Sequence, residues 1–106
     1  MVISGGVNIY PAEIEAVLQA MPGVADCAVF GIPDPEFGEA LGAAVQCLPG
    51  VTLSQQEVVD FLQQRLASYK LPKVVQWVSE MPREDTGKIF KRKLREPYWA
   101  GMARTI

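Results

Sequence analysis

Two short apolar runs, each ended by turn residues, limit most strongly what this chain can fold into. The first is "VADCAVFGI", from Val24 to Ile32, and it stops at Pro33-Asp34-Pro35. The second is "ALGAAVQCL", from Ala40 to Leu48, and it stops at Pro49-Gly50. Short apolar runs bounded by turn residues are typical of buried strands. Because "KVVQWVS", residues 73–79, alternates well enough for another strand, we expect a small sheet of about three strands.

Helical patterns alternate with these runs. "PAEIEAVLQAM" begins with Pro11, whose ring suits a first helical turn, and its apolar side chains recur at helical spacing to a predicted end near Pro22-Gly23. Ser54-Gln55-Gln56-Glu57 fits a capping box, which predicts a second helix running to about Leu66. A short basic helix is predicted from Lys91 to Arg95. This order predicts an α+β domain, in which helices cover a small mixed sheet with an N-terminal hairpin or turn.

Length and composition narrow the class of protein. A chain of 106 residues that is 49% hydrophobic suits one domain with its own core, so we take residues 1–106 as a single domain. The sequence has no apolar segment of about 18 residues and no leader pattern, so we expect a cytoplasmic protein. The absence of histidine excludes Ser-His and Cys-His nucleophiles and most zinc sites. Cys27 and Cys47 lie inside apolar runs without C-x-x-C spacing, which predicts buried free thiols and no metal site.

The net charge of −2 conceals an uneven distribution. Residues 1–64 contain eight acids and no Lys or Arg, whereas residues 65–106 hold all ten cations against four acids. Clustered cations favour an anionic partner, so nucleic-acid binding by the basic part is one candidate function. A non-catalytic interaction module is a second candidate, and a solvated helix face is the plain structural alternative. The pI near 5.0 and the acidic residues 1–64 argue against a nucleic acid as the partner.

The stretch "MPREDTGKIFKRKLRE", from Met81 to Glu96, places Thr86-Gly87-Lys88 in front of a run of cations. A nucleotide P-loop has the pattern G-x-x-x-x-G-K-[ST], in which the Lys reaches phosphates and the hydroxyl holds Mg²⁺. Here Pro82 stands in place of the first Gly, and Ile89 replaces the hydroxyl. The P-loop interpretation therefore fails, and by composition alone Lys88 is a solvated loop lysine.

Three stretches together resemble the C-terminal domain of the adenylate-forming (AMP-binding) acyl-CoA synthetases. They are "ISGGVNIYPAEIEAVL" at 3–18, "VFGIPDPEFGEALGAAV" at 29–45 and "LPKVVQWVSEMPREDTGKIFKRKLR" at 71–95. The ending "KLREPYWAGMARTI" looks closest to fatty-acyl-CoA synthetase relatives. The resemblance implies a mobile lid domain, with the family's large N-terminal AMP-binding domain absent from these 106 residues. We therefore expect the isolated domain to be inactive and to bind no cofactor tightly.

The resemblance also implies a reaction and roles for two loops. Family enzymes join a carboxylate to AMP from Mg-ATP and then transfer the acyl group to coenzyme A. Lys88 matches the adenylation lysine, and Gly87 would let the backbone approach closely. Gly5 and Gly6, in Ser4-Gly5-Gly6, match the loop that lines the pantetheine tunnel after the small domain rotates. An ordinary turn before the first helix is compatible with that role.

Three further residues match positions that hold the nucleotide end of coenzyme A in some relatives, namely Phe37, Tyr69 and Lys73. Ring stacking and one cation suit that ligand, although the two aromatics are equally compatible with the core or an interface. One such relative has Arg where this chain has Leu71. Pro82-x-x-x-x-Gly87-Lys88 also resembles the context of acetylated lysines, which makes a protein lysine acetyltransferase a predicted partner. Solvent or the large domain is expected to contact the cations after Lys88, which are Lys91, Arg92, Lys93 and Arg95.

Overall fold

A three-stranded mixed sheet forms the centre of the domain in a computed structural model that describes residues 2–36 and 38–100. The strand order is β3 (Val24–Asp34), β4 (Gly38–Cys47) and β5 (Val74–Trp77). β3 pairs with β4 antiparallel, and β5 joins β4 in parallel. The parallel strand needs a crossover, which helix α2 (Gln55–Gln63) and the short 3-10 turn η1 (Ser68–Lys70) provide.

An N-terminal hairpin forms a separate two-stranded sheet from β1 (Val2–Ser4) and β2 (Val7–Ile9). Ser4 pairs with Val7, so Gly5 and Gly6 make a two-residue turn. Their φ angles are 56° and 84°. Turns of this kind need positive φ at both central residues, which glycine adopts without a steric penalty. The predicted hairpin is thus present, and its turn is the glycine pair.

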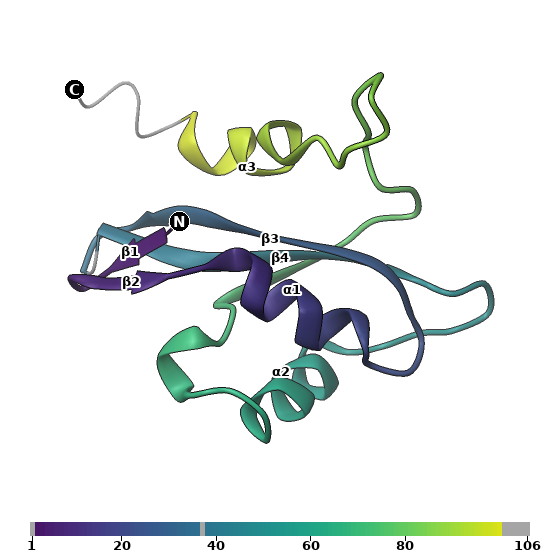
Figure 1. Cartoon of the computed structure of the whole chain (residues 1–106), viewed down its shortest axis with the longest axis horizontal. Helices are drawn as coiled ribbons and strands as arrows, with labels where there is room; N and C mark the ends of the chain where they lie inside the picture. The colour runs from purple at the N-terminus through teal and green to yellow at the C-terminus, as the bar shows by residue number, and fades with distance from the viewer. Residues whose placement is uncertain (1, 37, 101–106) are drawn as a thin grey trace.

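Helices cover both faces of the central sheet (Figure 1). Helix α1 (Pro11–Gln19) and α2 lie on one face, and α3 (Lys91–Trp99) lies on the other. Side chains alternate along β3, so Cys27 and Val29 join the α1/α2 core, whereas Ala28 and Phe30 join the α3 core. Burial on both faces explains why the strands are almost continuously apolar. The predicted α+β class is confirmed by this architecture.

The element ends differ from expectation at three places. Pro33 and Asp34 belong to β3 and not to the following turn; β3 is an edge strand, where a missing N–H is tolerated. The basic helix continues past Arg95 to Trp99 and includes Pro97. Helix α2 ends at Gln63, earlier than Leu66. Its predicted capping box is present: Ser54 Oγ accepts from Glu57 N at 3.1 Å, and Glu57 Oε1 accepts from Ser54 N at 3.1 Å.

Candidate functional site

Lys88 lies on the exposed tip of a tight loop, residues 82–90, which we call the lysine loop. The loop closes on itself because Glu84 N donates to Lys88 O at 2.8 Å and Gly87 N donates to Glu84 O at 2.9 Å. Gly87 has φ 90°, while a Cβ there would meet nothing within 4 Å. The turn therefore needs glycine for its backbone angle and not for lack of space.

The lysine loop borders a shallow pocket of about 700 Å³ on the side of α1. Ala12, Glu15, Ala16 and Gln19 of α1 line it together with Cys27, Arg83, Lys88, Ile89 and Lys91. Burial, with the negative charges of Glu15 and Asp26, raises the pKa of the Cys27 thiol to about 12. The thiol is therefore neutral and unreactive at physiological pH. Within the described part of the chain, no carboxylate forms an ion pair with Lys88.

A second pocket, of about 430 Å³, lies beside the glycine hairpin. It brings together Gly5, Tyr69 and Lys73, three of the residues that the sequence singled out, with Asp34 and Leu71. Its other lining residues are Ser4, Val7, Ile9, Ala40 and Leu41. Tyr69 is 52% exposed, so it is not a core residue. Phe37 lies outside the described residues.

Lys73 is the cation of this pocket, and it has a partner. Its Nζ donates to Asp34 Oδ2 at 2.6 Å, and this hydrogen bond and the carboxylate charge raise the Lys73 pKa. Lys73 is therefore protonated at neutral pH. Leu71 packs against the α1/α2 core and offers no charge at the position where one relative has Arg.

The two pockets lie at opposite ends of the sheet. Cys27 borders the first and Asp34 the second, and both belong to β3. The two residues are seven positions apart along an extended strand, which corresponds to roughly 23 Å. In Figure 1 the β1–β2 hairpin lies at the left, and the green loop before α3 lies at the upper right.

Among residues 2–36 and 38–100, four ion pairs join cations of the C-terminal part to acids of the N-terminal part. They are Lys70–Glu13 at 2.6 Å, Lys73–Asp34 at 2.6 Å, Lys91–Glu15 at 2.8 Å and Arg83–Asp26. The uneven charge distribution thus serves internal pairing as well as surface charge. Lys91, which the sequence assigned to solvent or to the large domain, is 38% exposed and also contacts Glu15 of α1. Arg92, Lys93 and Arg95 of α3 are exposed as expected.

Sequence reasoning missed the partners of these cations. Asp26 and Arg83 are 57 residues apart, and nothing in the local pattern of either residue signals their contact. Asp34 was interpreted as a turn residue, although its side chain is 1% exposed and it holds Lys73. A search of the described residues finds no group of three or more His, Cys, Asp or Glu side chains placed to hold a metal ion. The helices in this part of the chain are also too short or too polar to cross a membrane.

Comparisons with known proteins give the same family as the three sequence motifs. The model of the AMP-binding enzyme C-terminal domain family matches residues 13–88. A 3-[(3aS,4S,7aS)-7a-methyl-1,5-dioxo-octahydro-1H-inden-4-yl]propanoyl:CoA ligase of Rhodococcus jostii is 49% identical over 96 residues, covering 91% of this chain and 19% of that protein. The long-chain-fatty-acid–CoA ligase FadD13 of Mycobacterium tuberculosis is 49% identical over 100 residues, covering 94% of this chain and 20% of the ligase.

Solved structures show the same fold. The Mycobacterium tuberculosis fatty acyl CoA synthetase superposes with a TM-score of 0.85 at 48% identity, covering 95% of this chain and 20% of the synthetase. ATP-bound MatB from Rhodopseudomonas palustris superposes with a TM-score of 0.88 at 44% identity, covering 92% of this chain and 20% of MatB. The chain thus spans about a fifth of the length of the relatives that it matches. The resemblance read from the three motifs is confirmed, and the chain belongs to the AMP-binding enzyme C-terminal domain family.

Proposed function

We propose that this domain is the mobile C-terminal part of an ATP-dependent acyl-CoA ligase that forms AMP. The reaction joins a carboxylate, Mg-ATP and coenzyme A into acyl-CoA, AMP and pyrophosphate. Membership of the family and the ligase names of its relatives support this proposal. The partner of the domain is a large N-terminal AMP-binding domain, which holds ATP, the acyl group and the acyl-adenylate. The free thiols of Cys27 and Cys47 fit the reducing conditions of the cytoplasm.

Lys88 is the proposed catalytic residue of adenylation. Negative charge accumulates when a carboxylate attacks the α-phosphate, and positioned electrostatic stabilisation is the main help that a protein gives to phosphoryl transfer. A unit charge 4 Å from the developing charge contributes about 4 kcal/mol at an effective dielectric near 20. An exposed lysine with no ion pair in the described chain suits this task, because its charge is free to act on a ligand held by the other domain.

The glycine hairpin is proposed to serve the second half-reaction. Gly5 and Gly6 carry no Cβ, so backbone can approach the thin pantetheine arm of coenzyme A. The neighbouring pocket offers an exposed Tyr69 ring for the adenine and Lys73 for the 3′-phosphate.

The observation that carries the proposal is the separation of Lys88 from this hairpin. Lys88 borders the pocket at Cys27 and Gly5 borders the pocket at Asp34, and these two β3 residues lie roughly 23 Å apart along the strand. This separation supports a mechanism in which the two loops reach the reactive atom in different orientations of the domain. We therefore propose that the domain rotates between adenylation and thioester formation.

The first test compares residues 1–106 alone with the full-length enzyme in carboxylate-dependent exchange of pyrophosphate into ATP. The full-length enzyme is expected to catalyse exchange and the isolated domain is not, because one lysine and a glycine turn cannot enclose a nucleotide. Tight ATP binding or exchange by the domain alone would contradict the proposal. Nucleic-acid binding is the competing function, and it predicts a steep loss of affinity with salt in a filter-binding titration. Because four of the cations pair with acids of this domain, we expect weak nucleic-acid binding whose affinity changes little with salt.

Acetylation of Lys88 is a further part of the proposal. The exposed loop tip is accessible to a protein lysine acetyltransferase, and an acetyl group would remove the adenylation charge. Incubation of the folded enzyme with an acetyltransferase and acetyl-CoA should modify Lys88, as peptide mass spectrometry would show. An unmodified Lys88 in that experiment would end this part of the proposal.

A further inference from the structure

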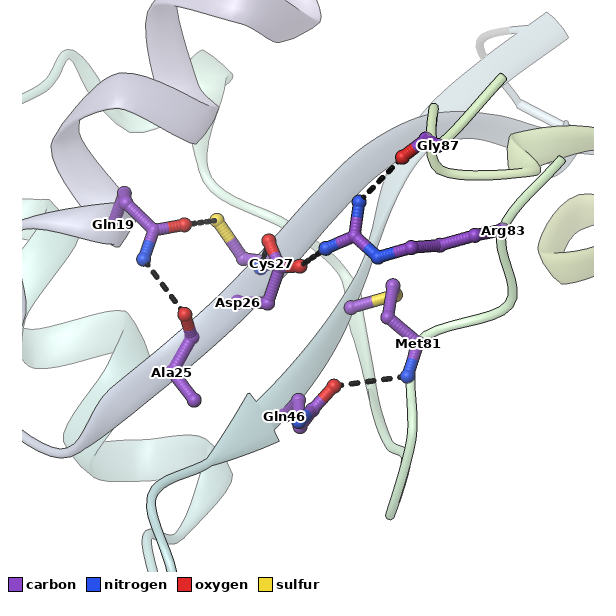
Figure 2. Close-up of polar contacts among 8 residues, drawn as sticks. All are labelled: Gln19, Ala25, Asp26, Cys27, Gln46, Met81, Arg83 and Gly87. Atoms are coloured by element: carbon purple, nitrogen blue, oxygen red, sulfur yellow. Dashed lines mark hydrogen bonds and ion pairs between the residues drawn. The ribbon is translucent and has the colours of Figure 1, made fainter. Parts of the chain in front are cut away.

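Arg83 lies at the base of the lysine loop and contacts two different parts of the domain. Its Nη1 donates to the carbonyl oxygen of Gly87 at 2.8 Å, and its Nη2 contacts Asp26 Oδ2 on β3 (Figure 2). A guanidinium holds its donors in a rigid planar fork, so the two contacts define the position of the loop relative to the strand. Gly87 is the residue directly before Lys88.

The acceptor on β3 is itself held in place. Asp26 Oδ1 accepts from Cys27 N at 2.9 Å, which leaves Oδ2 for Arg83. Asp26 also lies next to a register shift between Val24 and Asp26, and such bulges commonly re-aim a side chain. The carboxylate thus presents a fixed point for the arginine.

The β4 residue opposite Asp26 holds the segment that leads into the lysine loop. Asp26 pairs with Gln46 of β4, and Gln46 Oε1 accepts from Met81 N at 2.8 Å. Met81 is 4% exposed and packs in the α3 core. One cross-strand pair therefore fastens residues 81 and 83, at the start of the lysine loop, as Figure 2 shows.

The other end of the loop is fastened by a similar contact. Lys91 Nζ lies 2.8 Å from Glu15 Oε2, and the same oxygen accepts from Val29 N at 2.9 Å. Glu15 and Asp26 both accept backbone N–H groups of β3 and both pair with a cation flanking Lys88. Asp26 of β3 and Glu15 of α1, both bonded to the β3 backbone, thus hold the residues on either side of Lys88.

We propose that Arg83 is a positioning residue for Lys88, acting through the Gly87 carbonyl and the Asp26 carboxylate. This proposal rests on the proposed role of Lys88 in adenylation. Both terminal nitrogens of Arg83 already contact protein groups, so the arginine orients the loop and leaves the phosphate to the lysine. Misplacing a reacting group by about 1 Å costs on the order of 10²-fold in rate. Loss of the fork should therefore slow adenylation without weakening ATP binding.

The experiment uses the full-length enzyme with Arg83→Met, Arg83→Lys, Lys88→Ala and the double variant Arg83→Met/Lys88→Ala. Arg92→Met is the matched control, because Arg92 is an exposed cation on α3. Arg83→Met should lower kcat of ATP-pyrophosphate exchange roughly 10- to 100-fold with little change in KM for ATP. Arg83→Lys should restore little of the rate, since an ammonium cannot reproduce the planar fork. Transfer from pre-made acyl-adenylate to coenzyme A should be unchanged in all variants.

The double variant separates positioning from a direct role. If Arg83 acts through Lys88, adding Arg83→Met to Lys88→Ala should cause no further loss of exchange. Multiplying losses, or a raised KM for ATP, would overturn the proposal by showing that Arg83 acts on the substrate itself. Parental exchange in Arg83→Met beside a slow Lys88→Ala would also overturn it and leave the role of Lys88 intact. A parental rate in Lys88→Ala would instead reject the proposed function.

Discussion

The Nζ atom of Lys73 lies 2.6 Å from Asp34 Oδ2, so an exposed cation covers a buried carboxylate at the end of β3. The Lys73 side chain is 61% exposed, whereas that of Asp34 is 1% exposed. Asp34 Oδ1 accepts from Glu36 N at 2.9 Å, which helps to hold the carboxylate. The pair places Lys73 in the lining of the pocket beside the glycine hairpin.

Lys73→Ala should weaken binding of coenzyme A through its 3′-phosphate. A hydrogen bond to a charged group contributes about 1.5–3 kcal/mol, which corresponds to a rise in KM of roughly 10- to 150-fold. Steady-state kinetics with coenzyme A and with dephospho-coenzyme A would measure this rise in KM. The substitution should have little effect on dephospho-coenzyme A, which lacks the 3′-phosphate. An equal loss with both thiols would contradict the assigned contact.

Tyr69→Ala should also raise KM for coenzyme A, because the exposed ring lines the same pocket. Stacking of a base on an aromatic ring is worth about 1–3 kcal/mol, so we expect a rise in KM of roughly 5- to 150-fold. Trp77→Ala is the matched control, since Trp77 is 42% exposed and borders a different pocket. Initial rates at varied concentrations of coenzyme A would give KM for each variant. An equal rise in KM from the two substitutions would contradict stacking at Tyr69.

Gly6→Leu should slow thioester formation and largely spare adenylation. Gly6 has φ 84°, and a Cβ there meets nothing within 4 Å, so a Leu side chain would clash with no part of this domain and would crowd a ligand that approaches the turn. Gly50→Leu is a close control, because Gly50 has φ 79° and an equally open Cβ position in a different turn. Both variants carry similar backbone strain. Rapid-quench transfer from acyl-adenylate should fall in Gly6→Leu alone; a comparable fall in Gly50→Leu would attribute the loss to strain.

Much of the fold was predictable because its signals are local. The runs of β3 and β4 are apolar on both faces, and the Ser54–Glu57 capping box involves residues three apart. The ends of β3 and α3 were less predictable. Pro33 and Pro97 usually end such elements, yet an edge strand tolerates the first and the helix accommodates the second.

In the candidate site, only the residues that lie in compact sequence motifs could be predicted from the sequence. Lys88, Gly5 and Gly6 were found from sequence because they lie in compact motifs. The Arg83–Asp26 and Lys73–Asp34 contacts span 57 and 39 residues, and they exist only because the strands bring distant segments together. Charge counting detected the excess of cations in residues 65–106 but could not assign partners to them.

Cys27 should react slowly with thiol reagents in the folded protein. Burial first, and then Glu15 and Asp26, raise its pKa from 9.0 to about 12, so little thiolate exists at pH 8. Iodoacetamide labelling followed by mass spectrometry should modify the half-buried Cys47 first. Faster labelling of Cys27 than of Cys47 would contradict its assigned environment.

The raised pKa of Cys27 also predicts how the free energy of unfolding changes at alkaline pH. The folded protein holds the Cys27 proton more tightly than the unfolded chain does, so this contribution is complete below about pH 9 and is lost as the pH rises toward 12. The free energy of unfolding should therefore fall with pH in that range by at most about 1.4 kcal/mol per pH unit from this group. Urea titrations of the parent and Cys27→Ala should show a shallower fall in the variant; identical slopes would contradict the prediction.

We propose that Lys88 acts in adenylation and has left the active site when the thioester forms. The most direct measurement is both half-reactions of Lys88→Ala in the full-length enzyme. ATP-pyrophosphate exchange should slow by roughly 10²-fold or more, the scale of one well-placed electrostatic stabiliser. Transfer from pre-made acyl-adenylate to coenzyme A should stay close to the parental rate. Equal damage to both half-reactions in a folded variant would contradict the claim and make Lys88 a structural or docking residue.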